Sequence, residues 1–177
     1  GPKDKKQRQA LAYFYNQFQQ RSPDDDYIKN SNLNKVLEDY LMSLIVQSEN
    51  PKLVLENCFA VLKDYKFVGV SYKKIIDYLS DFKNGKFVSQ EFLKILPLEL
   101  AVSFDSAYLF PLPKFDSDDK YIEEVKKVAR ELRVLFLKNK IKEISLSLKA
   151  GEKEEDIKKV SDLEKELAST INLLSNS

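Results

Sequence analysis

Apolar residues recur at helical spacing along the chain, and few segments show the alternation typical of a strand. Near the N-terminus, Leu11, Phe14, Tyr15 and Phe18 fall at positions i, i+3, i+4 and i+7, which predicts an amphipathic helix with an aromatic face. The polar segment at residues 22–26 ends this pattern and is typical of a solvated linker.

Several shorter helices are predicted after this linker. Asn30-Ser31 can cap the first, and Asn50-Pro51 offers a cap followed by proline at the first helical position of the second. Further helical stripes follow Ser71 and Ser89, with Asn84-Gly85 as a stop signal between them. One more short helix covers about residues 98–106.

The chain must be extended over residues 110–113, because each of the two prolines pushes its predecessor out of helical geometry. Asp116-Ser117 then caps the longest predicted helix. Nearly every position from 132 to 137 is apolar, and a helix that is apolar on several sides is covered on several sides. We therefore expect the first half of this helix to lie inside a bundle and the second half, from Leu137, to emerge from it.

The last helix should pack antiparallel on the emerging half. Its apolar residues recur at about 3.5-residue spacing, which suits such a pair; they are Ile157, Val160, Leu163, Leu167, Ile171 and Leu174. We expect the hinge around Ala150-Gly151 and a solvated tip at residues 152–156.

The pattern as a whole predicts an all-α fold: a bundle of about six helices followed by a protruding C-terminal two-helix hairpin that shares a long helix with the bundle. The expected division is an N-terminal arm and linker (residues 1–30), the bundle (residues 31–136) and the hairpin (residues 137–177). Gly1-Pro2 resembles the short remnant that cleavage by a protease leaves, so we expect a piece of a longer protein.

Composition argues against catalysis by this piece. The chain has no histidine, which removes the commonest general base and metal ligand. Its one cysteine, Cys58, lies in a predicted helix and is interpreted as a packed side chain. A Gly-rich phosphate loop is absent, and Asp24-Asp25-Asp26 is interpreted as a solvated turn rather than a magnesium site. We expect no enzyme activity, no cofactor and no metal.

Charge and hydropathy narrow the partners further. Lys and Arg (29) nearly balance Asp and Glu (28), so we do not expect direct binding to nucleic acid. Basic residues cluster at residues 3–8 and along the long helix (Lys126, Lys127, Arg130, Arg133, Lys138, Lys140 and Lys142), where interleaved acids favour a merely solvated face. No apolar run is long enough for a membrane span, and the lone thiol favours a reducing, cytoplasmic setting.

Two segments resemble a known family. Residues 36–45 (VLEDYLMSLI) followed by Asn50-Pro51 are similar to the opening of the helical module shared by bacterial replicative primases and the N-terminal domain of their helicase. Residues 132–150 (LRVLFLKNKIKEISLSLKA) and 160–167 (VSDLEKEL) resemble the close of the C-terminal domain of DnaG-type primases, and residues 96–100 (LPLEL) resemble another part of it. The family commonly has a Gly-Asp pair at the hairpin turn, whereas Glu155-Asp156 occupy that place here.

The resemblance implies a non-catalytic docking domain that holds a primase on the hexameric replicative DNA helicase in the bacterial cytoplasm. It also implies that the bundle modulates the helicase, that the hairpin supplies much of the grip, and that zinc-binding and polymerase parts precede residue 1. The residues expected to bind the partner are Leu163, Leu167, Ile171 and Leu174, with Ile141, Ile144 and Leu148 opposite, and the rim charges Lys165 and Glu166.

Three alternatives stay open. The apolar residues of the hairpin could serve only to hold it closed. The chain could instead be a helicase N-terminal domain, another helical adaptor, or a helical nucleic-acid-binding domain. Self-association through the hairpin, or through the stripe from Leu11 to Phe18, is also compatible with the pattern; that stripe could equally pack on the bundle or capture another partner.

Overall fold

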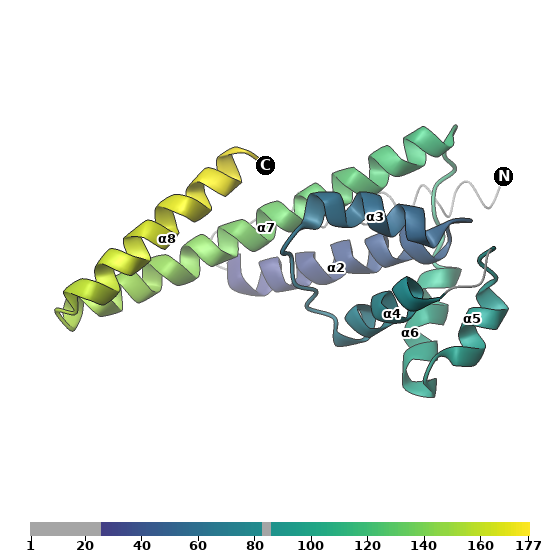
Figure 1. The fold of residues 1–177 in the computed structure, drawn as a ribbon, viewed down its shortest axis with the longest axis horizontal. Coiled ribbons are helices and arrows are strands. Elements are labelled where there is room, and N and C mark those ends of the chain that lie inside the picture. Colours follow the sequence, from purple (N-terminus) through teal and green to yellow (C-terminus); the bar gives the residue numbers. More distant parts are fainter. Residues whose placement is uncertain (1–25, 83–85) are drawn as a thin grey trace.

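The computed structural model describes residues 26–82 and 86–177, which form seven helices and no strand (Figure 1). The predicted all-α class is thus confirmed. In chain order the helices are α2 (Asp26–Val46), α3 (Pro51–Leu62), α4 (Val70–Asp81), α5 (Ser89–Ile95), α6 (Leu98–Leu109), α7 (Asp118–Lys153) and α8 (Ile157–Ser175). The aromatic stripe from Leu11 to Phe18 and the stop signal Asn84-Gly85 lie outside the described residues.

Several of the predicted helix ends are confirmed by capping geometry. The side chain of Asn50 accepts a hydrogen bond from the backbone N–H of Leu53 at 3.2 Å, and Pro51 takes the first helical position of α3. In the same way, the hydroxyl oxygen of Ser117 accepts from the backbone N–H of Lys120 at 3.2 Å at the start of α7. Each cap satisfies an amide that the helix itself leaves unpaired.

The start predicted for the first bundle helix is wrong. Helix α2 begins at Asp26, so Asn30-Ser31 lie inside it, and the helix crosses the expected boundary at residue 30. Asn and Ser favour helix starts because their side chains compete for backbone hydrogen bonds, but a helix interior tolerates them at small cost. They therefore permit a helix start without requiring one.

The core of the bundle lies where α2, α3 and α7 meet, with α4, α5 and α6 on one side (Figure 1). Leu37, Leu41 and Leu132 are fully buried. Phe92 of α5 is also fully buried, and its ring lies 5.6 Å from that of Phe82 and 5.3 Å from that of Phe104, centroid to centroid. Full burial stabilises each such side chain by roughly 1.5–3 kcal/mol, so these rings hold the short helix α5 in place.

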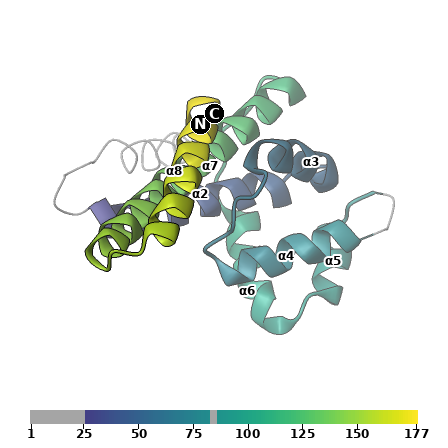
Figure 2. The same cartoon turned by 60° about the vertical axis from the view of Figure 1, so that its left-hand side comes forward.

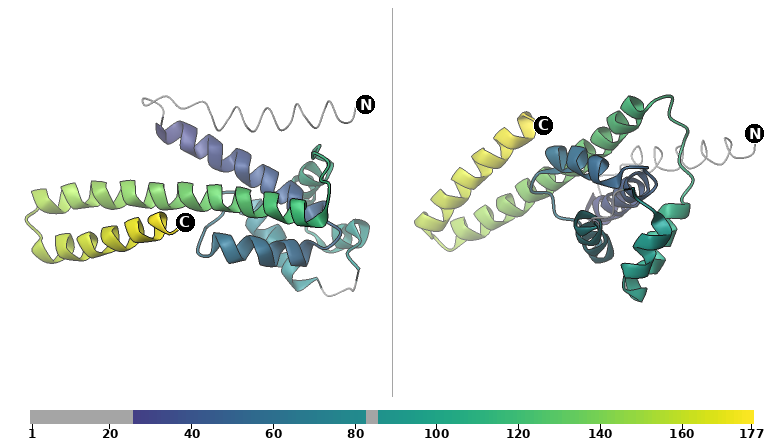
Figure 3. Two further views of the ribbon diagram at one scale, coloured as in Figure 1. Left: turned by 90° about the horizontal axis from the view of Figure 1, so that it is seen from above. Right: turned by 45° about the vertical axis from the view of Figure 1, so that its right-hand side comes forward.

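Helix α7 belongs to both parts of the molecule. It packs on α2 and α3 in its first half and on α8 in its second half, without a break (Figure 2). Seen from above, α7 and α8 run side by side and project beyond the other helices (Figure 3). Burial continues past the expected division of α7, because Leu137 is fully buried.

Candidate protein-interaction surface

The turn of the hairpin lies later in the chain than the expected hinge. Ala150 and Gly151 are helical residues of α7, which ends at Lys153. The reversal occurs at Glu155, whose φ of 58° is left-handed, and the Asp156 side chain then caps α8 by accepting from the backbone N–H of Lys159 at 3.1 Å. The prediction of a hinge at Ala150-Gly151 is therefore wrong, and Glu155-Asp156 form the turn.

Gly151 serves the packing of the two helices rather than the turn. It is buried, and a Cβ at this position would lie 3.2 Å from Cγ2 of Val160, closer than an ordinary van der Waals contact. Glycine thus lets α7 and α8 approach closely next to the turn. Gly151 suggested a hinge in the sequence, but in the fold its missing side chain makes room for the neighbouring helix.

The contact between Gly151 and Val160 sets the register of the hairpin. Counting away from it along two antiparallel helices, Leu148 comes level with Leu163, and Ile144 comes level with Leu167. The residues predicted to face a partner therefore lie largely along the seam between α7 and α8.

Burial agrees with this register. Ile144 is buried, whereas Ile141, Leu148, Leu163, Leu167 and Leu174 are partly buried. On α8, Thr170 rather than Ile171 lies in the seam, because Thr170 is 1% exposed and Ile171 is 46% exposed. The Thr170 hydroxyl donates to the carbonyl of Glu166 at 2.8 Å, which satisfies this buried polar group. Periodicity alone missed Thr170 because its residue type reads as polar.

A different set of residues faces outward from the hairpin. Ile171 belongs to it, together with Ile157 at the first position of α8, which is 85% exposed, and Leu146 of α7, which is 67% exposed. Ile157 and Ile171 are fourteen positions apart and so share one face of α8. The predicted rim charges Lys165 and Glu166 are exposed as well. Exposed apolar side chains on a charged, projecting hairpin form a candidate surface for a protein partner.

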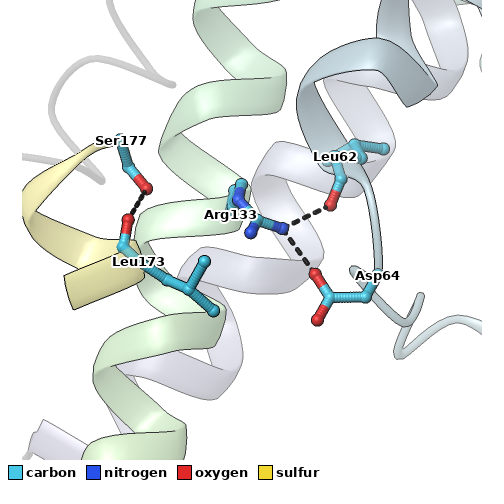
Figure 4. Close-up of polar contacts among 5 residues, drawn as sticks. All are labelled: Leu62, Asp64, Arg133, Leu173 and Ser177. Carbon is cyan, nitrogen blue, oxygen red and sulfur yellow. Dashed lines mark hydrogen bonds and ion pairs between the residues drawn. The ribbon is translucent and has the colours of Figure 1, made fainter. Parts of the chain in front are cut away.

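An arginine fixes the point where α7 leaves the bundle. Arg133 is only 6% exposed, and its Nη1 donates to the carbonyl of Leu62 at 3.0 Å and to the Asp64 carboxylate at 2.5 Å (Figure 4). The hydrogen bond from Arg133 holds the pKa of Asp64 below its usual range. The expectation that Arg133 belongs to a solvated basic face is wrong, because it ties the end of α3 to α7.

Figure 4 also shows the end of the chain, where the Ser177 hydroxyl donates to the carbonyl of Leu173 at 2.6 Å. Helix α8 packs on α7 and makes no comparable contact with another described helix. The position of α8 therefore depends on α7, and Arg133 secures α7 to the bundle.

A second buried ionisable group lies in the bundle. The Glu38 carboxylate is 1% exposed and accepts from the Tyr65 hydroxyl at 2.7 Å and from the backbone N–H groups of Val68 and Gly69 at 2.7 and 2.8 Å. Burial raises the pKa of Glu38, and these hydrogen bonds oppose the rise. The group fixes the segment between α3 and α4, a role that no sequence pattern indicated.

Groups with catalytic potential are sparse among the described residues. Cys58 is fully buried, and burial raises the pKa of its thiol to about 12, so the reactive thiolate is not formed at neutral pH. Across residues 26–82 and 86–177, no three Cys, Asp or Glu side chains are grouped so that they could hold a metal ion. None of the described helices is long and apolar enough to cross a membrane.

Comparison of the chain with protein families, curated proteins and solved structures gives no match. The candidate surface therefore stands on its geometry alone: a closed two-helix hairpin, anchored through Arg133, with Leu146, Ile157 and Ile171 facing outward.

Proposed function

We propose that this chain is a protein-docking domain, and that its partner is the hexameric replicative DNA helicase, to which it would attach a bacterial primase of the DnaG type. The observation that carries the docking role is the projecting hairpin. Helix α8 makes extensive contacts with α7 and with no other described helix. It leaves Ile157 and Ile171 exposed on one outer face. The layout of bundle, shared long helix and terminal hairpin is the one that the resemblance leads us to expect.

In this proposal the candidate binding residues have two roles. Seam residues such as Leu148, Leu163 and Leu167 keep the hairpin closed, and they act on a partner only by positioning the outer face. Ile157 and Ile171 are the apolar anchors that a partner can cover. Burial of such a side chain contributes roughly 1.5–3 kcal/mol, so two of them can supply the core of a small interface.

Charge on the hairpin would act mainly on the rate of association. Lys165 and Glu166 are both exposed on α8. Exposed charges of this kind contribute little to affinity, because water and salt screen them, but they steer a partner into register. We therefore expect a salt-dependent association rate and a dissociation rate set by Ile157 and Ile171.

The direct test is co-elution of the chain with the purified replicative helicase of the same organism on a size-exclusion column. The chain should elute with the hexamer, and a variant lacking residues 154–177 should not. If the shortened chain still co-elutes fully, the hairpin is not the docking element. If the intact chain fails to bind the helicase but is captured by a different replication protein, the docking role survives and the assignment of the helicase is wrong.

A further inference from the structure

A groove of about 650 Å³ runs between α2 and α6, on the bundle and away from the hairpin. Its walls include Val36 and Asp39 of α2, Tyr72 of α4, and Val102 and Phe110 at either end of the α6 side. Val102 is 71% exposed although it lines this groove. Leu98 and Leu109, 85% and 76% exposed, continue the same face of α6 at helical spacing. An exposed apolar stripe of this kind, beside a groove, is typical of a surface that another segment covers.

One end of the groove favours positive charge. Gln47, just after α2, donates through Nε2 to the carbonyls of Ala107 and Phe110 at 2.8 and 2.7 Å, so the C-terminal ends of α2 and α6 lie together. Neither helix has a basic residue in its last turn. Because the C-terminal end of a helix carries partial negative charge, two such ends side by side attract a cationic segment.

We propose that the chain's own residues 3–18 dock in this groove as an amphipathic helix, in the same molecule. These residues lie outside the described part of the chain, and their sequence has the matching chemistry. Leu11, Phe14, Tyr15 and Phe18 form one apolar, aromatic stripe. Lys3, Lys5, Lys6 and Arg8 precede that stripe, so the segment is basic at one end and apolar at the other.

The connection has the required reach. Residues 19–25 separate Phe18 from Asp26, and each can span at most about 3.3–3.6 Å, which allows roughly 25 Å. Asn32, at the near end of the groove, lies six residues into α2, or about 9 Å along the helix at 1.5 Å per residue. A reversal within residues 19–25 is therefore short enough to place Phe18 near Asn32.

Length and polarity then fix the orientation. The stripe from Leu11 to Phe18 is about 10 Å long as a helix, and the part of α2 that lines the groove, from Asn32 to Ser43, is about 16 Å long, so the stripe fits within it. Antiparallel to α2, the segment carries its basic residues toward the paired C-terminal ends of α2 and α6. The parallel orientation would require a longer connection and would carry the basic residues away from those ends.

The test uses a nitroxide spin label on α6. Asp105 is exposed and adjoins the groove without lining it, so Asp105→Cys can carry the label in the full chain, while native Cys58 is fully buried. We expect the label to broaden the amide NMR signals of residues 11–18. A mixed sample contains spin-labelled chain without ¹⁵N and ¹⁵N-enriched chain without the spin label. In this sample only docking between two copies broadens the signals, so it separates that case from docking within one molecule.

Two variants make the result specific. Val102→Glu places a charge in the groove at an exposed position and should abolish the broadening of residues 11–18. Val70→Glu is the matched control, because Val70 is 68% exposed and does not line the groove, and it should leave the broadening intact. Unchanged signals of buried core amides verify that both variants fold.

Three outcomes would overturn the proposal: full signal intensity for residues 11–18 beside the label, broadening of these residues that persists in the mixed sample, or equal loss in both variants. The second outcome would assign the groove to a neighbouring copy. None of the three bears on helicase docking, which is measured at the hairpin.

Discussion

Replacement of Glu38 by Gln tests how the segment between α3 and α4 is held. The carboxylate receives three donors, one on Oε1 and two on Oε2. The amide of Gln keeps one acceptor oxygen and turns an N–H₂ group toward the donors on the other side. At least one donor therefore loses its partner, and a new donor faces it.

The structure gives the size of the effect. A buried donor that loses its acceptor costs about 1–3 kcal/mol, and the bond from Tyr65 is buried, whereas those from Val68 and Gly69 are partly buried. We expect Glu38→Gln to lower the free energy of unfolding by about 2–3 kcal/mol. Tyr65→Phe removes one donor and leaves the carboxylate its two amide partners, so it should cost about 1 kcal/mol.

Equilibrium urea unfolding, followed by far-UV circular dichroism at neutral pH, measures both values. Glu56→Gln is the control, because Glu56 is exposed on α3, and it should lie within about 0.5 kcal/mol of the parent chain. A loss of less than about 0.5 kcal/mol in Glu38→Gln would contradict the reasoning, and so would a loss in Tyr65→Phe that exceeds the loss in Glu38→Gln. The first result would mean that the segment is held by its apolar contacts alone.

Three further predictions follow from the other contacts. Gly151→Leu should force α8 away from α7 at Val160 and increase hydrogen exchange along α8, whereas Ala150→Leu at an exposed position should not; equal exchange in both variants would show that close approach at Gly151 is dispensable. The pKa of Asp64 is lowered in the folded state, so its contribution to stability is present above the unfolded pKa of about 3.9 and is lost as pH falls through the folded value. Asp64→Asn should therefore reduce the fall in the free energy of unfolding at acid pH. An unchanged fall would refute this. Cys58 should react with a thiol reagent only after denaturation, and rapid labelling of the native chain would contradict its burial.

The helices of this fold were predictable because apolar periodicity is a local property of the chain. Asn50-Pro51 and Ser117 marked helix starts correctly, since a cap depends on residues within one turn. Asn30-Ser31 failed because the same residue types are tolerated within a helix, and α2 continues through them.

The hairpin surface was predictable only in part. Periodicity located the apolar residues of α7 and α8, but it could not tell which of them face each other. That division depends on the register, which the approach of Gly151 to Val160 sets, and it places Thr170 in the seam and Ile171 outside. A threonine in a seam looks polar in a sequence because its hydroxyl is satisfied by its own helix, which only the fold reveals.

The buried charged groups were not predictable. Glu38 is buried because its donors come from residues 65–69, about thirty positions later, and Arg133 because its acceptors lie near the end of α3. A sequence read one segment at a time assigns such residues to solvated faces. Only the packing of distant helices supplies their partners.

We propose above all that the outer face of α8 binds the replicative helicase. Isothermal titration of the hexamer with the double variant Ile157→Glu/Ile171→Glu tests it most directly, with Val70→Glu as the matched exposed control. Loss of two apolar anchors should weaken binding at least about tenfold, or about 1.4 kcal/mol, while the control binds as the parent chain does. Parent-like affinity in the double variant, or an equal loss in the control, would contradict the account.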